Sequence, residues 1–184
     1  MQPTETLRND HAVLRGKLML LEGLLPLGRA AYFPLRDVAY SLTRRLRCHI
    51  EKEERLLLLM QQGAFPHPLA PVSALLDEHR DQRVTVALLL ELVINGSTSS
   101  IDQIVLCASH LIDSLRGHMA REEAEIFPFV EQTMTRNQKM AAMQDMRAIA
   151  ARYYPEGEPA PWPSDIDEHL VNEWSSPRHV VCAN

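Results

Sequence analysis

The sequence has few of the features that mark several common protein classes. Only three of its 184 residues are cysteine, and none forms a C-x-x-C pair, which argues against a disulfide framework and favours a reducing compartment. Aromatic residues make up 5% of the chain. Its net charge is −5, and the sequence contains no block of basic residues. Nucleic acid is therefore not an expected partner.

Sequence features that direct a chain to a membrane are also scarce. Residues 1–10 are polar and lack the basic and apolar regions of a signal peptide. The apolar stretches 18–27 and 84–94 are interrupted by glutamate, and neither approaches the ~20 residues needed to cross a bilayer. We therefore expect a cytoplasmic protein without a membrane partner.

The apolar residues predict an all-α protein. Leucine and alanine dominate, and β-branched residues do not cluster in the alternating runs typical of strands. Turn and cap signals place the expected helices at 4–27, 34–62, 71–94, 100–128 and, for a shorter fifth helix, 135–154. Thr135 and Gln138 form a capping-box pattern at the start of the fifth, and Pro128 predicts a kink or an end in the fourth.

The length is typical of one domain. We expect residues 1–154 to form an up-down-up-down antiparallel four-helix bundle with the short fifth helix. Residues 155–184 contain four prolines in their first nine positions and predict a C-terminal tail without a core of its own. Trp162 and Trp174 could hold this tail against the bundle.

An internal repeat relates the two halves of the predicted bundle. The pattern H-x-x-x-E-E occurs at 49–54 and again at 118–123, and each copy follows a helix with a single histidine, His11 or His79. His11 precedes His49 by 38 residues and His79 precedes His118 by 39. Two helical hairpins of one design explain these spacings.

The repeat predicts that the four histidines lie at one height in the bundle. Each is roughly 15–17 residues from the turn of its hairpin, or about 22 Å at 1.5 Å rise per residue. In each copy a glutamate follows the histidine by four residues, so both side chains lie on one helix face. Six side chains should therefore converge: His11, His49, Glu53, His79, His118 and Glu122.

Four imidazoles and two carboxylates suit two metal ions rather than one tetrahedral zinc. Each ion would take two histidines, Glu53 and Glu122 would bridge both, and an oxide or hydroxide would complete the bridge. Iron is favoured, with manganese or zinc as alternatives. The count leaves coordination positions for an exogenous ligand.

Other polar residues are interpreted as lying outside this ligand set. Glu51 and Glu54 are expected to face solvent or to stand behind the ligands, Glu123 to face solvent, and His110 to be partly exposed or to stand behind the ligands. Core packing is the expectation for Cys107, and for Tyr32 and Tyr40 it is favoured over a redox role or a role in supporting the ligands. The histidines of the loop and tail are interpreted as non-ligands: His67, His169 and His179.

These motifs resemble the hemerythrin-like family, the HHE cation-binding domain, over about residues 5–150. The resemblance rests on Asp10-His11, Glu78-His79, the segment 49–54 and, most specifically, the segment 118–128, HMAREEAEIFP. It implies a four-helix bundle with a non-haem di-iron centre, in which the four histidines are terminal ligands and the two glutamates are bridges.

The sequence departs from the oxygen-carrying hemerythrins at two positions. Those proteins have a second histidine four residues after the ligand of the third helix, where this chain has Arg83, and their last carboxylate is an aspartate five residues after its histidine, where Glu122 here follows at four. Simple reversible oxygen carriage is therefore in doubt. The remaining set is similar to that of di-iron proteins that repair iron–sulfur clusters and of an iron- and oxygen-sensing domain in a ubiquitin ligase.

Three hypotheses follow from these observations. The first is a protein that senses or binds O2, NO, peroxide or iron at a di-iron centre. The second is an enzyme that reduces NO or peroxide, or that repairs iron–sulfur clusters under nitrosative or oxidative stress. The third is a helical bundle that has lost its metal.

Overall fold

The computed structural model describes residues 2–61, 70–95 and 101–157, and the regular structure in these ranges is entirely helical. The all-α prediction is confirmed. The elements in chain order are α1 (Pro3–Leu24), η1 (Leu25–Ala31), α2 (Tyr32–Gln61), α3 (Ala70–Asn95), α4 (Ile101–Arg121), the π-helical η3 (Glu122–Ile126), α5 (Phe127–Thr133) and α6 (Arg136–Tyr153).

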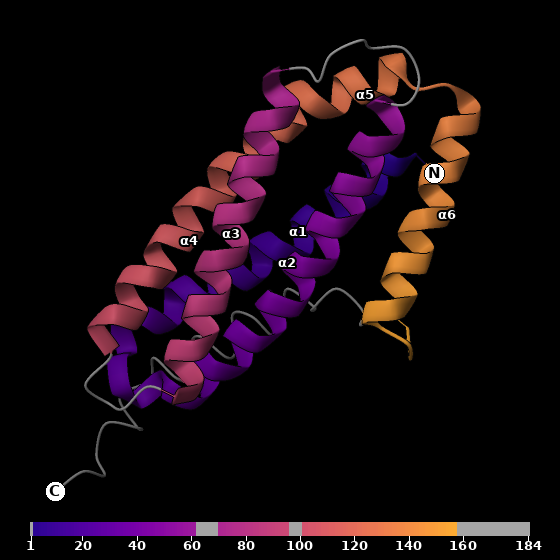
Figure 1. Cartoon of the computed structure of the whole chain (residues 1–184). Helices are drawn as coiled ribbons and strands as arrows, with labels where there is room; N and C mark the ends of the chain where they lie inside the picture. Colours follow the sequence, from indigo (N-terminus) through magenta and orange to yellow (C-terminus); the bar gives the residue numbers. More distant parts are fainter. Residues whose placement is uncertain (1, 62–69, 96–100, 158–184) are drawn as a thin grey trace, which may run out of the picture.

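The four long helices form the predicted bundle. α1 packs against α2 and α4, and α3 packs against α2 and α4, so each helix has two long neighbours. The helices alternate in direction, and the C-terminal ends of α1 and α3 lie at the same end of the bundle (Figure 1). This arrangement brings the two halves of the sequence repeat to equal heights.

The predicted fifth helix is α6, which packs outside the bundle, mainly against α2 (Figure 1). Its capping box is present as predicted: the Thr135 hydroxyl accepts from the Gln138 backbone N–H, and the Gln138 side chain accepts from the Thr135 backbone N–H. Because two otherwise unpaired donors are satisfied, α6 begins at a defined residue. The predicted tail lies outside the described residues from 158 onward.

Each long helix buries a stripe of residues spaced alternately by three and four. In α3 the stripe contains every described residue that is buried: Leu75, His79, Gln82, Val86, Leu89 and Val93. This spacing of 3.5 residues is the pattern of helices packed nearly parallel in bundles. The stripe therefore points α3's histidine into the bundle interior together with its leucines and valines.

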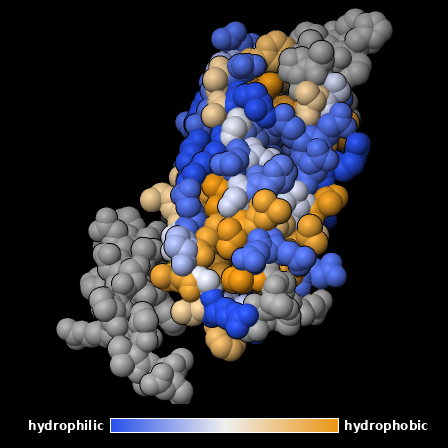
Figure 2. Space-filling view, turned by 90° about the vertical axis from the view of Figure 1, so that its left-hand side faces the viewer, coloured by the Kyte–Doolittle hydropathy of each residue, from blue (hydrophilic) through white to orange (hydrophobic). Residues whose placement is uncertain are grey.

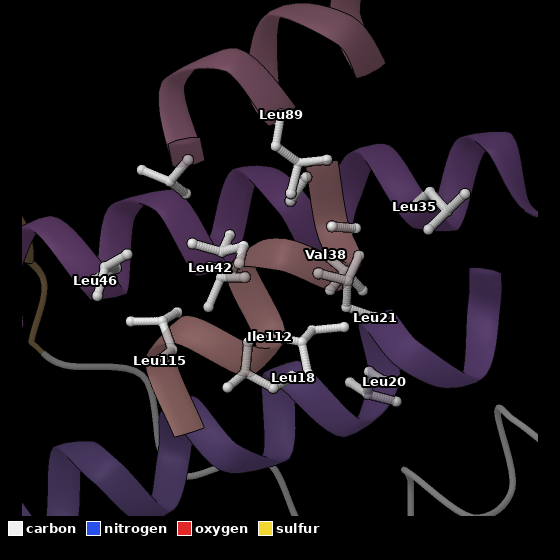
Figure 3. Packing of buried hydrophobic residues seen from close by; sticks show 14 of the residues in the cluster. Leu18, Leu20, Leu21, Leu35, Val38, Leu42, Leu46, Leu89, Ile112 and Leu115 are labelled. Carbon is white, nitrogen blue, oxygen red and sulfur yellow. The ribbon is translucent and has the colours of Figure 1, made fainter. Parts of the chain in front are cut away.

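The two larger apolar clusters lie on either side of the histidine layer, and a third, smaller cluster joins Cys48 of α2 to Ile149 and Tyr154. The larger cluster includes Leu14, Leu46 and Leu115, and Figure 3 shows part of it, from Leu46 and Leu115 to Leu20 and Leu35. The other includes Leu7 of α1 and Phe127 of α5. Since each cluster excludes water from one side of the layer, polar groups between them must find protein or ligand partners.

The fourth long helix changes register where its proline predicted a kink. α4 ends at Arg121, the five residues of η3 adopt π-helical geometry, and the backbone N–H of Phe127 bonds to the carbonyl of Glu122. Pro128 then occupies the first turn of α5. Proline has no N–H to donate, so the extra residue of the π segment is accommodated immediately before it.

The surface of the bundle is also divided along its length. On the face in Figure 2, polar residues gather over the half nearer α5, and apolar residues gather over the half nearer the interhelical turns. The exposed apolar residues of α3 and α4 include Val84, Leu88 and Leu106.

By length and composition alone, Pro3–Gln61 could pass for a membrane span, but core helices pass the same test and this stretch folds back at η1.

Candidate metal centre

Each long helix places one histidine in the layer between the two apolar clusters, and α2 and the α4–η3 continuation each add a glutamate one turn further on. The side chains of all six are at most 3% exposed. The structure brings together every residue that the repeat predicted for the centre: His11, His49, Glu53, His79, His118 and Glu122. That these residues bind metal stays a prediction.

The six residues form two overlapping groups that share both glutamates. One group adds His11 and His49 to the shared pair, and the other adds His79 and His118; the donor atoms of each group lie within 4.8 Å of one another. Glu122 spans the groups, because its Oε2 lies 3.2 Å from His11 Nε2 and its Oε1 lies 3.2 Å from His118 Nε2. A carboxylate in this position can bridge two ions.

The separations between donor atoms match those of atoms bound to a common ion. His79 Nε2 and His118 Nε2 are 3.3 Å apart, and Glu53 Oε2 lies 3.3 Å from both His49 Nε2 and His79 Nε2. Two donors about 2.1 Å from one ion and about 90–110° apart are separated by about 3.0–3.4 Å. The centre therefore has the right size for metal without large rearrangement.

Several of these atoms have no hydrogen-bond partner among the described residues. The Nε2 atoms of His11 and His49, both carboxylate oxygens of Glu53 and Oε2 of Glu122 are buried and unpartnered. Burying such groups without compensation is costly. Metal ions between the two groups would satisfy all five atoms at once, so the donor set fits a dinuclear centre.

On the far side of each histidine ring stands a carboxylate from another helix, and we call these four groups the outer carboxylates. The Nδ1 atoms of His11 and His118 lie 2.7 Å from Glu123 and Glu78, and that of His79 lies 3.3 Å from Glu54. His49 Nδ1 faces Asp10 at the longer distance of 3.6 Å. Such contacts orient imidazoles whose other nitrogen binds metal and increase their basicity.

Each outer carboxylate is held in turn by at least one cation. Arg83 grips both oxygens of Glu54 at 2.8 Å. The other pairs are Arg15 with Glu123, Arg121 with Glu78, and Lys52 and Arg45 with Asp10. Arg83 therefore supports His79, a predicted metal ligand, through Glu54.

The electrostatics of the metal-free centre favour bound protons. Burial disfavours the charged form of His118, but the nearby carboxylates of Glu122 and Glu53 outweigh it and raise the pKa of His118 to about 10. The hydrogen bond with His79, aided by Arg83, lowers the pKa of Glu54 to about 2. Metal ions must displace protons held in this way.

Sequence reasoning assigned some neighbouring residues correctly and missed others. Glu51 pairs with Arg152 at the surface, and His110 is exposed, so neither reaches the centre. Glu54 and Glu123 stand behind the ligands rather than in solvent, and Lys52 is a fully buried cation that no sequence signal indicated. The acidic residue directly before each single histidine, Asp10-His11 and Glu78-His79, was the available signal for the two remaining outer carboxylates.

The expectations for residues further from the centre had mixed outcomes. Cys107 packs in the larger core cluster as predicted, and the Tyr32 hydroxyl donates to the Val93 carbonyl from a partly buried position. The expectation that Tyr40 packs in the core was wrong, because its side chain is 60% exposed. Tyr40 follows Ala39 of the buried stripe and so points away from the bundle.

The fold and the geometry define a class of protein: a four-helix bundle with a buried centre of four histidines and two glutamates that could hold metal. The family model described as the hemerythrin HHE cation binding domain matches residues 2–130. The chain therefore belongs to the hemerythrin family. No curated protein and no solved structure matches it.

Proposed function

We propose that the protein holds two iron ions and uses them to bind or sense a small ligand such as O2, NO or peroxide, or to report iron itself. The observation that carries the proposal is the convergence of four Nε2 atoms and two shared carboxylates in a water-excluded layer. The other ring nitrogen of each imidazole, Nδ1, faces an outer carboxylate. Rings oriented in this way are preorganised for metal rather than for packing.

The donor count supports both iron and an open position. Two histidines and one oxygen from each bridging glutamate supply four protein donors to each ion. A six-coordinate ion keeps room for a bridging oxide or hydroxide and for an exogenous ligand, a pattern typical of non-haem iron sites. Manganese and zinc also accept imidazole and carboxylate, so metal analysis distinguishes the three.

A cytoplasmic location is part of the proposal. The two described cysteines, Cys48 and Cys107, are free and buried, which is compatible with a reducing compartment.

The test is metal analysis of freshly purified protein, followed by anaerobic optical spectra before and after addition of O2 or NO. We expect about two iron ions per chain and a spectral change with at least one ligand. Less than about one iron ion per chain, or unchanged spectra with both ligands, would overturn the proposal.

A matched pair of variants shows whether the metal occupies this centre. His118→Ala removes a central Nε2, whereas His110→Ala removes an exposed imidazole two turns earlier on the same helix. We expect the first to lower the iron content and the second to leave it unchanged. Equal iron content in both variants would place the metal elsewhere.

Enzymatic reduction of NO or peroxide, or repair of iron–sulfur clusters, is the second candidate. The shared glutamates would hold two ions next to each other, as chemistry that uses two metals requires. Steady-state turnover of NO or hydrogen peroxide by the iron-loaded protein would favour this candidate, and stoichiometric binding without turnover would favour the first.

A further inference from the structure

One polar side chain in the bundle interior is left without a partner. Gln82 belongs to the buried stripe of α3 and is 1% exposed. Neither its amide oxygen nor its amide nitrogen has a hydrogen-bond partner among the described residues. Burying an amide without hydrogen bonds destabilises a fold, so packing alone does not explain a glutamine at this position. The amide is available to a group that the protein chain does not supply.

Gln82 lies one step along the α3 stripe from His79. Residues three apart on a helix are neighbours, with Cβ atoms about 5–6 Å apart. Both residues are at most 1% exposed, so both occupy the interior side of α3. The amide is therefore in the part of the bundle next to the group formed by His79 and His118.

The repeat shows that an apolar residue would be ordinary at this position. Gln82 follows His79 by three residues, as Leu14 follows His11. In the antiparallel helices the corresponding step leads from His49 to Leu46 and from His118 to Leu115, and all three leucines are buried in one cluster. Gln82 is thus the one polar member of an otherwise apolar layer beside the centre.

This layer has the composition of a site for a small ligand. Three leucine side chains exclude water, and one amide offers an N–H donor and a carbonyl acceptor. We propose that Gln82 is the hydrogen-bond partner of the exogenous ligand at the metal centre, and that the ligand is a small polar species such as azide, NO, peroxide or hydroxide. The inference rests on the proposed function, because it requires iron in the centre.

The proposal predicts opposite effects of Gln82 on stability and on ligand binding. Without ligand, the unsatisfied amide destabilises the fold, so Gln82→Leu, which copies Leu14, should raise the melting temperature of the metal-free protein by about 2–6 °C. With ligand, the lost hydrogen bond should weaken binding roughly five- to tenfold. A residue with only a packing role would not separate the two measurements.

The experiment uses azide as the probe, titrated into the full-length iron-loaded protein and followed by its optical spectrum and by the azide stretching frequency. The variants are Gln82→Leu and Gln82→Met, and Leu89→Met serves as a control that changes shape but not polarity in the buried stripe of α3, outside this layer. We expect weaker azide binding and a shifted stretching frequency in both Gln82 variants, and neither effect in the control.

Each contrary result has a defined meaning. Unchanged azide affinity in both Gln82 variants, or an equal loss in Leu89→Met, would overturn the inference while the di-iron proposal stands. Loss of iron from Gln82→Met would make Gln82 a metal ligand and would also overturn it. Wild-type protein that takes up no iron, or no azide when loaded, would overturn the di-iron or ligand-binding proposal and with it the inference.

Discussion

The two hairpins of the bundle supply equivalent groups to the centre but surround them differently. In the α1–α2 hairpin, Asp10 stands behind His49 and is held by Lys52, whereas in the α3–α4 hairpin Glu78 stands behind His118 and is held by Arg121. The side chain of Asp10 is 3% exposed and that of Glu78 is 32% exposed. Equivalent positions in the repeat thus differ in how far they are exposed to water.

The cause of the difference is α6. It packs against α2 and α1, and the Tyr154 ring at its end lies 4.6 Å from the Arg44 guanidinium and 5.8 Å from that of Arg45. Among the described residues, no helix covers the α3–α4 hairpin in this way. The repeat therefore specifies the ligands, and an element outside the repeat decides how deeply their supporting charges are buried.

The largest expected effect removes what the two hairpins share. Glu122→Ala deletes a bridge that contacts a histidine of each group, so we expect the iron content to fall from about two ions per chain to nearly none, with a lower melting temperature because bound metal stabilises the fold. Elemental analysis and thermal melts provide the measurement. Glu125→Ala, at an exposed position on the same segment, should change neither.

The second prediction tests the asymmetry directly by comparing Asp10→Ala with Glu78→Ala in the metal-free protein. Loss of Asp10 leaves Lys52 and Arg45 buried without their carboxylate and should cost about 3–5 kcal/mol of unfolding free energy. Loss of Glu78 frees a half-exposed arginine and removes the partner of the His118 Nδ1, and should cost less, about 1–3 kcal/mol. Urea unfolding measures both, and equal costs would show that α6 does not bury its hairpin more deeply in solution.

The third prediction uses the protons of the metal-free centre. The pKa of His118 is raised to about 10, so at pH 7 this imidazole holds a proton that metal must displace. Metal binding should therefore release protons at pH 7, and the affinity should rise as the pH rises toward 10. Calorimetry in buffers of different ionisation enthalpy measures the release, and an affinity independent of pH between 7 and 9 would contradict the raised pKa.

The smallest expected effect loosens the cover over the α1–α2 hairpin. Thr135→Ala removes the N-cap of α6 and should cost about 1 kcal/mol. Hydrogen exchange should then increase in α6 more than in α3, because only α6 loses its terminal hydrogen bonds. Faster exchange spread evenly over all helices would show that α6 unfolds only together with the bundle.

Much of the fold could be predicted because its determinants are local. The heptad-like stripes, the Gly28 turn with its φ of 55° and the capping box at Thr135 are each recognisable within a few residues. The boundaries differ by only a few residues, for example at Tyr32, two residues before the expected Pro34. The division into a bundle at 1–154 and a tail at 155–184 stays a prediction.

The composition of the centre could also be predicted, but its surroundings could not. Histidine and glutamate four residues apart must share a helix face, and equal distances from the turns must bring four helices' histidines to one height. By contrast, nothing local indicates that Glu123 of η3 reaches His11, or that the Lys52 ammonium group is buried beside Asp10. Such contacts depend on how far each helix is rotated about its axis.

By itself, the sequence determined the helical bundle, the alternating directions of its helices and the six central residues. The hydrophobic period, the turn residues and the internal repeat that specify them can all be recognised from spacings along the chain. Only the tertiary structure decided which carboxylate supports which histidine, which hairpin is covered, and that the Gln82 amide stands unpartnered in an apolar layer. These features arise between helices, where rotation and packing set distances that no spacing in the sequence encodes.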